Sequence, residues 1–309
     1  MERNEVIVSE QELARQKEFT RKMREMNDRR TRTPLALVDT FGCQQNVADG
    51  EVLMGMLREM GYELTRDEQQ ADVILLNTCA IREHAEKRVY GHLGRLSHTK
   101  AAKPNQIICL CGCMAQQKVV ADKVKNSYHH VDLVLGPQAE WRLPELLHEV
   151  YTKNKRVFSI EDEHGRIAED LPIVREGGVR AWVSIMYGCN NFCSYCIVPY
   201  VRGRERSRAS ARIIEEAREL KADGVKEIML LGQNVNSYGL DVEGELSFAQ
   251  LLAELDKVGI ERIRFMTSHP KDISDELIDV MASGKHICHA LHLPVQHGNN
   301  RILQSMNRR

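Results

Sequence analysis

Short apolar runs alternate with longer amphipathic stretches through the first half of the sequence. The runs LALVDT, DVILLNT, QIICLCG and VDLVLG have the length and the Val, Ile and Leu content of buried strands. Between them lie VADGEVLMGMLREM, REHAEKRVYGHLGRL and AQQKVVADKVK, whose apolar residues recur at helical spacing. Buried strands separated by helices are typical of a parallel sheet with helical crossovers. The pattern therefore predicts an N-terminal parallel-sheet α/β domain over residues 33–150.

The same alternation begins again near residue 178. Strands are predicted at AWVSIM, EIMLLG, RIRFMTS and HALHLPV, and helices at SARIIEEARELKADG and ISDELIDVMASG. Four strand and helix units are visible before the sequence stops at MNRR, in a charged segment without a closing element. We therefore expect a second α/β domain over residues 178–309, and we expect the sequence to be a fragment of a longer protein.

Two segments interrupt this pattern. Residues 1–32 carry many charges and a capping box from Ser9 to Glu12, which predicts a solvated leader helix. Residues 151–177 lose the periodicity and contain Gly, Pro and an acidic patch, which predicts a linker.

Composition narrows the class of protein. The 43 basic and 44 acidic residues give a net charge of -1, so any attraction to nucleic acid or membrane must be local. No apolar run reaches the roughly 18 residues of a membrane span, and the N-terminus is too charged for a secretory signal. Nine cysteines in such a chain argue against a disulfide framework. We expect a cytoplasmic protein with reduced thiols and no membrane association.

Three cysteines lie close together in GCNNFCSYC, directly after the strand AWVSIM: Cys189, Cys193 and Cys196. Ligands of α/β sheets and barrels bind in the loops at the C-terminal ends of strands. A structural zinc site needs four ligands, and no second CxxC pair lies nearby. Three thiolates suit an iron-sulfur cluster with one iron left open, while zinc and an unligated loop remain the alternatives.

A second set of cysteines follows three strands of the N-terminal domain: Cys43, Cys79 and Cys113. The ends of parallel strands lie at one edge of a sheet, so these residues should converge on a shared ligand. Cys109 and Cys111 precede Cys113 within its strand and are interpreted as strand packing, as is Cys288.

The CxxxCxxC loop resembles that of the radical S-adenosylmethionine (SAM) superfamily, in which the open iron chelates the methionine moiety of SAM. The motifs GCQQN, NTCAIRE, GCMAQ, CIVPYVRGRERSR, LLGQNVNSYG, TSHP and HLPVQHG resemble, in this order, those of the methylthiotransferase family over residues 35–309. The resemblance implies that the C-terminal domain is a partial, truncated radical SAM (βα) barrel. It also implies two 4Fe-4S clusters: one on Cys189, Cys193 and Cys196 that cleaves SAM, and an auxiliary one on Cys43, Cys79 and Cys113 that carries sulfur. Gln45 stands where many family members have methionine.

The same resemblance suggests further contacts. The residues expected near SAM, by analogy or by their place at strand ends, are Tyr195, Gly232, Gln233, Asn234, Ser268 and Gln296, with His269 beside them. Four arginines at period-two spacing are expected to bind tRNA phosphates or stack on loop bases: Arg202, Arg204, Arg206 and Arg208. The alternative for these arginines is a solvated loop paired with Glu205 and other acids.

The implied function is a tRNA methylthiotransferase that converts N6-(dimethylallyl)adenosine to its 2-methylthio derivative at position 37 of the anticodon loop. The same chemistry on N6-threonylcarbamoyladenosine or on a ribosomal protein aspartate is the alternative within the family. A metal-binding RNA module without catalysis is the alternative outside it. The expected partners are tRNA, an electron donor such as flavodoxin or ferredoxin, and a sulfur source, with a monomeric enzyme.

Overall fold

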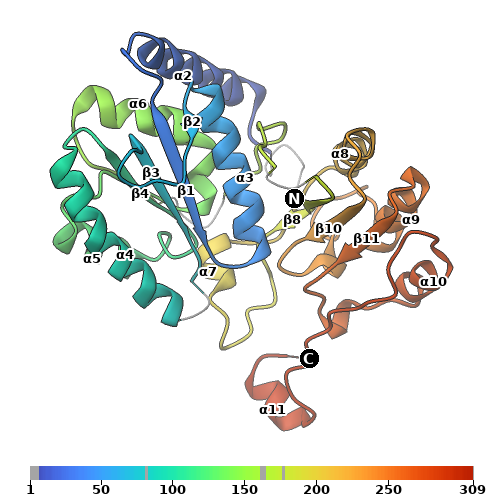
Figure 1. Cartoon of the computed structure of the whole chain (residues 1–309). Helices are drawn as coiled ribbons and strands as arrows, with labels where there is room; N and C mark the ends of the chain where they lie inside the picture. The colour runs from blue at the N-terminus through green and yellow to red at the C-terminus, as the bar shows by residue number, and fades with distance from the viewer. Residues whose placement is uncertain (1–6, 81–82, 161–164, 176–177, 309) are drawn as a thin grey trace. The chain divides into compact units, whose positions relative to one another are not determined.

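The computed structural model describes the chain except for residues 1–6, 81–82, 161–164, 176–177 and 309. The described chain forms two compact units, which divide between Val174 and Arg175 (Figure 1). We call Ile7–Val174 the N-terminal unit and the part that begins at Arg175 the C-terminal unit. The division falls inside the segment in which the sequence predicts a linker.

The N-terminal unit contains a fully parallel six-stranded sheet in the order β2-β1-β3-β4-β5-β6. The strands are β1 (Leu35–Phe41), β2 (Glu63–Leu64), β3 (Val73–Thr78), β4 (Ile107–Gly112), β5 (Leu133–Leu135) and β6 (Val157–Ser159). The four strands predicted from the apolar runs are confirmed as β1, β3, β4 and β5. The short strands β2 and β6 are additional, and β6 lies in the first part of the predicted linker.

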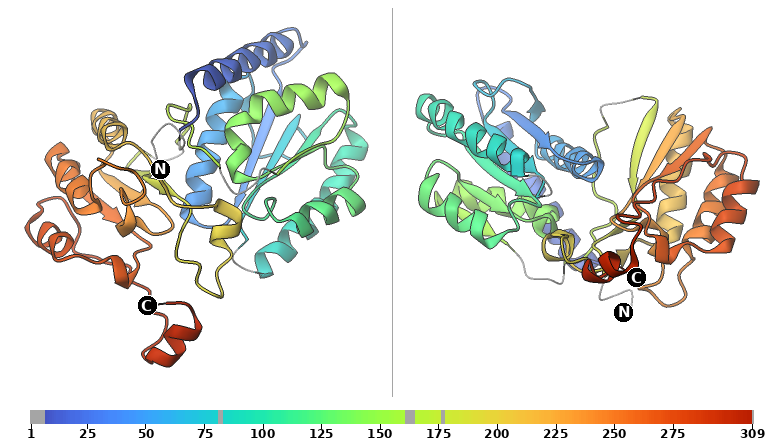
Figure 2. Two further views of the ribbon diagram at one scale, coloured as in Figure 1. Left: turned by 180° about the vertical axis from the view of Figure 1, so that it is seen from behind. Right: turned by 90° about the horizontal axis from the view of Figure 1, so that it is seen from below.

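Helices cover both faces of this sheet (Figures 1 and 2). They are α2 (Glu10–Asp28), α3 (Gln44–Glu59), α4 (Glu83–Ala102), α5 (Lys118–Ser127), the 3-10 helix η1 (Pro137–Arg142) and α6 (Leu143–Lys153). Along β3, Val73 and Leu75 pack with α3 and α6, while Ile74 and Leu76 pack with α4 and α5. The two-residue period of a strand thus sends its side chains into two separate cores, which explains why the strand sequences are continuously apolar.

The charged N-terminal helix differs from the solvated leader that we predict. Its capping box is present, since the Ser9 side chain accepts from the Glu12 backbone N–H and the Glu12 carboxylate accepts from that of Ser9. However, α2 packs against α6, with Met23 fully buried in the core and the Asn27 side chain donating to the Met60 carbonyl. One buried methionine and a few satisfied polar groups hold a helix whose overall composition is polar, so its periodicity is weak in the sequence.

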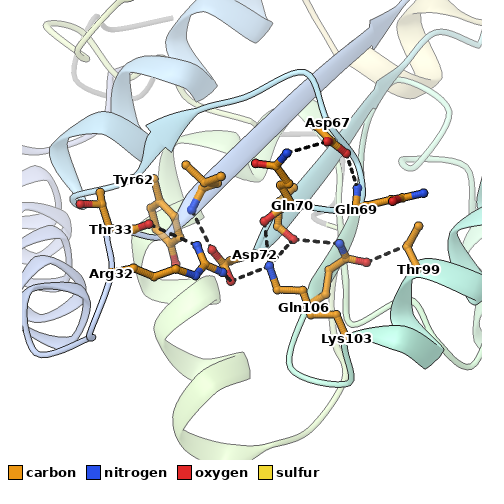
Figure 3. A network of polar contacts seen from close by, with 12 residues as sticks. Arg32, Thr33, Tyr62, Asp67, Gln69, Gln70, Asp72, Thr99, Lys103 and Gln106 are labelled. Atoms are coloured by element: carbon orange, nitrogen blue, oxygen red, sulfur yellow. Dashed lines mark hydrogen bonds and ion pairs between the residues drawn. The ribbon is translucent and has the colours of Figure 1, made fainter.

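Ion pairs close the N-terminal edge of the sheet, where the strands begin (Figure 3). Asp72 precedes β3, and its carboxylate accepts from the Leu35 backbone N–H, from Arg32 and from Lys103, each at 2.8 Å. Burial alone would raise the pKa of Asp72, but these hydrogen bonds outweigh burial and lower it. At the start of β5, Asp132 pairs with Lys100 of α4 at 2.8 Å.

The C-terminal unit contains a parallel three-stranded sheet in the order β11-β10-β7, with helices on one side (Figure 2). The strands are β7 (Arg180–Ser184), β10 (Glu227–Leu231) and β11 (Arg262–Phe265), beside the antiparallel pair β8 (Met186–Tyr187) and β9 (Arg206–Ser207). The helices are α7 (Val198–Arg202), α8 (Ser210–Ala222), α9 (Phe248–Val258), α10 (Asp275–Ser283) and α11 (Asn300–Ser305), with the 3-10 helices η2 (Val235–Ser237) and η3 (Pro270–Asp272). This is a partial barrel of the predicted class.

The fourth predicted strand, HALHLPV, is not a strand in the structure. An isolated parallel bridge joins Ile287 to Ile263, and residues 288–299 have no regular secondary structure, with Leu291 and Val295 exposed. The apolar residues of the alternating pattern are therefore not buried here as those of a strand in a packed sheet would be. Among the described residues, no helix is both long and apolar enough to cross a membrane.

Candidate functional site

The sheet register of the N-terminal unit places three cysteines side by side. Phe41 pairs with Thr78, and Thr78 pairs with Gly112, so β1, β3 and β4 end level with one another. The three cysteines follow at once as Cys43, Cys79 and Cys113. The three cysteines therefore follow strand ends that lie level at one edge of the sheet.

Two glycines allow these loops to approach each other. A Cβ atom on Gly42 would lie 2.7 Å from the Cβ of Cys79. A Cβ atom on Gly112 would lie 2.4 Å from the Thr78 carbonyl oxygen, and Gly112 has a φ of 86°, which side chains rarely adopt. The glycines before Cys43 and Cys113 thus leave room for the residues of the neighbouring loop or strand end.

The first cysteine of this set lies at the start of a helix and contacts a buried amide. Cys43 caps the N-terminus of α3, where the helix dipole stabilises negative charge, and its thiol donates to the Asn46 side chain at 3.4 Å. Asn46 is fully buried and donates in turn to the Asn77 side chain and the Thr78 carbonyl. A buried amide network therefore ties the first loop to the second.

The remaining three cysteines belong to neither set. Cys109 and Cys111 are completely buried in the core of the N-terminal unit, as expected for strand packing. Cys288 is partly buried, and its backbone N–H donates to the Ile263 carbonyl.

The second set lies in one loop of the C-terminal unit, directly after β8. Gly188 begins the loop with a φ of 79°, and a Cβ there would lie 2.0 Å from the Arg204 carbonyl oxygen. The Cys189 backbone N–H donates to the Gly203 carbonyl at 3.1 Å. Asn190 and Glu205 exchange hydrogen bonds between side chain and backbone in both directions. The cysteine loop is therefore held against residues 203–205.

Burial disfavours the thiolate form of two cysteines in this loop. Burial raises the pKa of Cys189 to about 11 and also raises the pKa of Cys196. Metal binding would therefore release protons from this loop. The buried carboxyl group of Glu205 lies close enough to contribute to the shift at Cys189, and burial raises the pKa of Glu205 as well.

The chemistry of the donor set indicates what it could hold. A structural zinc ion needs four ligands, whereas in a cubane iron-sulfur cluster each thiolate binds a different iron. The cysteine loop of the C-terminal unit offers three thiols at CxxxCxxC spacing, which fits a cluster with one iron left open.

Polar groups without partners lie at the neighbouring strand ends. Asn234 follows β10, and Ser268 follows β11. The Asn234 side-chain amide donates to Asp272 at 2.8 Å, but its Oδ1 has no hydrogen-bond partner among the described residues. The Ser268 hydroxyl likewise has no hydrogen-bond partner among the described residues, and the side chains of Asn234 and Ser268 are almost fully buried. Buried polar atoms normally have partners, so these two are suited to contact a bound polar ligand.

The other residues predicted near the cofactor have different surroundings. The Gln233 side chain accepts the Gly188 backbone N–H and so joins the end of β10 to the start of the cysteine loop. Gly232 is buried against Met186. Tyr195 is 51% exposed, and Gln296 is exposed with a φ of 65°. The structure thus brings the strand-end residues to the loop but leaves Tyr195 and Gln296 open.

The four predicted RNA-binding arginines do not share one surface. Arg202 and Arg206 are only 4% and 7% exposed, and Arg206 donates to the Arg202 carbonyl. Arg208 pairs with Glu216 at 2.9 Å and donates to the Ser184 carbonyl. Arg204 is exposed, with its guanidinium 4.3 Å from the centroid of the Phe192 ring. Arg204 is therefore the member of the four that is best placed to meet RNA.

Sequence reasoning missed two contributors to the C-terminal site. Glu205 was considered as a partner for solvated arginines, yet it is buried against the cysteine loop. Arg308 lies far along the chain and contacts Cys193, and no spacing in the sequence connects the two.

Comparison with known proteins identifies both units. Residues 36–136 match "Uncharacterized protein family UPF0004", and residues 183–309 match "Radical SAM superfamily". The second match implies SAM and one 4Fe-4S cluster as cofactors. The solved structure of the radical SAM methyltransferase TsrM from Kitasatospora setae shares the fold, with a TM-score of 0.59 and 15% identity over 87% of this chain and 60% of that chain.

Similar curated proteins cover the whole chain. A tRNA-2-methylthio-N(6)-dimethylallyladenosine synthase from Acetivibrio thermocellus is 50% identical over 100% of this chain and 65% of its own length. One of the same name from Clostridium perfringens is 51% identical over 89% of this chain and 62% of its own length. The chain therefore spans slightly less than two thirds of these relatives. With both domains matched in order, the chain belongs to the radical SAM methylthiotransferase family.

Proposed function

We propose that the protein methylthiolates N6-(dimethylallyl)adenosine at position 37 of tRNA. The observation that carries this proposal is the presence of two separate three-cysteine sets, one at strand ends in each unit. One set suffices for a radical SAM enzyme, while insertion of sulfur needs a second site that presents sulfur. The relatives at 50% identity bear the name of this activity.

Each set has a distinct role in the proposal. Cys189, Cys193 and Cys196 would hold the cluster that, when bound, supplies the electron for cleavage of a carbon-sulfur bond in SAM. Cys43, Cys79 and Cys113 would hold an auxiliary 4Fe-4S cluster that provides the sulfur. Abstraction of hydrogen from C2 of an adenine needs a carbon radical, because no acid or base in a protein removes that hydrogen.

Other residues of the chain bind and orient. Asn234 Oδ1 and Ser268 Oγ are placed to accept or donate hydrogen bonds to polar groups of SAM, and Gly232 leaves room beside them. Gln233 fixes the start of the cysteine loop relative to β10. Burial of these groups keeps water away from the reacting atoms. Tyr195 and Gln296 remain proposed SAM contacts on the open side of the loop, and Arg204 a proposed RNA contact.

The remaining partners are part of the same proposal. The reaction needs tRNA, an electron donor such as flavodoxin or ferredoxin, and a source of sulfur for the auxiliary cluster. We place it in the cytoplasm, where tRNA occurs, with a monomeric enzyme.

The test is nucleoside analysis after reaction. Reconstituted protein with SAM, a reductant and tRNA that carries N6-(dimethylallyl)adenosine should yield the 2-methylthio nucleoside by mass spectrometry. A variant with Cys43, Cys79 and Cys113 changed to alanine should still cleave SAM but leave tRNA unmodified. Product on threonylcarbamoyladenosine tRNA or on a ribosomal protein, and none on this tRNA, would reassign the substrate. Bound zinc without labile sulfide and no SAM cleavage would indicate an RNA module.

A further inference from the structure

A segment near the end of the described chain is fastened to the cysteine loop of the C-terminal unit. The Ser194 backbone N–H donates to the Met306 carbonyl at 3.0 Å, and the Ser194 hydroxyl donates to the Ser305 carbonyl at 3.1 Å. The Asn307 side chain donates to the carbonyls of Asn191 and Phe192 at 3.3 and 3.0 Å. We call residues 305–308 the strap. It binds the loop between the first and third cysteines of the set.

The strap supports a loop conformation that is unfavourable by itself. Phe192 has a φ of 44°, in the left-handed region that is unfavourable for a residue with a side chain. Its carbonyl accepts from the Asn307 side chain, and Asn307 is also left-handed, with a φ of 53°. Asparagine tolerates this conformation better than most residues do. Asn307 thus helps to hold the turn that presents Cys193.

Arg308 brings a positive charge to the cysteine itself. Its Nη1 lies 3.6 Å from the Cys193 sulfur and 3.4 Å from the Tyr195 hydroxyl, while Nη2 donates to the Pro294 carbonyl. The Arg308 side chain is 7% exposed, so solvent screens its charge weakly. Among the described residues no carboxylate pairs with Arg308, although buried charges normally have a partner of opposite charge. An anionic cluster bound to Cys193 would be such a partner.

We propose that Arg308 is a positioning residue that raises the reduction potential of the cluster held by Cys189, Cys193 and Cys196; this rests on the proposed ligand set. Reduction adds one electron, taken from the external donor, and so adds one negative charge to the cluster. The N–H donor on the sulfur and the guanidinium charge both stabilise the more negative state. Asn307 keeps the sulfur within reach of that donor.

Redox titration tests the proposal directly. The parent carries alanine at Cys43, Cys79 and Cys113, so that one cluster remains, and its midpoint potential is measured by electron paramagnetic resonance with mediator dyes. R308Q should lower the ratio of reduced to oxidised cluster at a fixed potential about tenfold, which is about 59 mV for one electron. R308K keeps the charge but loses the planar fork, so its shift should be smaller. R301Q removes an exposed arginine of α11 and should leave the potential unchanged.

Each outcome decides one question. A parent protein without a cluster signal after reconstitution contradicts the proposed ligand set and leaves no basis for the role of Arg308. A parent with a cluster and an R308Q potential equal to that of R301Q overturns the proposal for Arg308 alone. If R308Q binds too little iron for titration, R308K decides: a potential unchanged from the parent overturns the proposal, and a lowered one supports it.

Discussion

The two cysteine sets are built in opposite ways. The set of the N-terminal unit comes from three loops, and each loop is placed by a strand whose register with its neighbour is fixed. The set of the C-terminal unit comes from one loop, which is placed by side chains and by a distant segment: Gln233, Glu205 and the strap. A sheet can bring distant residues together with backbone contacts alone. A single loop needs side-chain support to hold three ligands in place.

Among the substitutions that distinguish the two cysteine sets, Gly112→Ala should have the largest effect on stability. The new Cβ would meet the Thr78 carbonyl and would occupy a left-handed position, so we expect a loss of stability of at least about 2 kcal/mol. Urea unfolding of the N-terminal unit, together with iron content, measures it. Gly94→Ala is the matched control, because its Cβ meets nothing within 4 Å and alanine favours a helix. Equal stability of the two variants would contradict the role of close loop approach.

The opposite edge of the same sheet provides the second test. Asp72→Asn removes the charge that accepts from Arg32 and Lys103, and we expect a loss of about 1–3 kcal/mol in urea unfolding at neutral pH. The iron content should stay unchanged, because this edge is remote from the cysteines. A loss of iron equal to that of Gly112→Ala would show that the two edges are not independent.

The stability difference between the parent protein and Asp72→Asn should depend on pH, because the pKa of Asp72 is lowered in the folded protein. A carboxyl group with a lower pKa in the folded protein adds stability above its unfolded pKa of roughly 4. That contribution disappears as the pH falls through the folded-state pKa. The stability difference between the parent protein and Asp72→Asn should therefore be constant near neutrality and shrink below about pH 4.

The support of the single loop can be tested at Gln233. Gln233→Leu removes the acceptor of the Gly188 N–H, so iron should leave the C-terminal cluster for a chelator roughly ten times faster. Gln233→Glu keeps an acceptor oxygen and should lose iron more slowly than the leucine variant. Identical rates for both variants would mean that the hydrogen bond does not stabilise the loop.

The smallest effect should come from Arg204→Ala. Loss of one exposed guanidinium should weaken tRNA binding a few-fold and reduce the slope of log affinity against log salt by about one. Arg218→Ala, an exposed arginine of α8 paired with Glu215, is the control and should change neither quantity. Filter binding at several salt concentrations provides the measurement.

Most of the fold could be predicted from the sequence, because buried parallel strands have long apolar runs. The strands β1, β3, β4 and β5 and the helices between them follow this rule. β6 could not be predicted, since Val157–Ser159 is too short to show a period. The helix α2 was misjudged because Met23 is its one fully buried apolar residue.

The site was predictable to the extent that backbone order determines it. The positions of Cys43, Cys79 and Cys113 after the ends of three strands follow from the strand pattern. The prediction that the four arginines share one surface was wrong. A period of two assumes a continuous extended segment, whereas Arg202 ends α7 and Gly203 turns the chain with a φ of 75° before β9. The strap could not be predicted from the sequence, because side-chain hydrogen bonds between distant segments leave no periodic pattern of residues.

The proposed function requires that the protein hold two independent clusters. We would measure iron and acid-labile sulfide per chain after anaerobic reconstitution of the parent and of two variants, each with one cysteine set changed to alanine. We expect about eight irons in the parent and about four in each variant. About four irons in both the parent and the variant without Cys43, Cys79 and Cys113 would refute a second cluster, because the sulfur donor would then be missing.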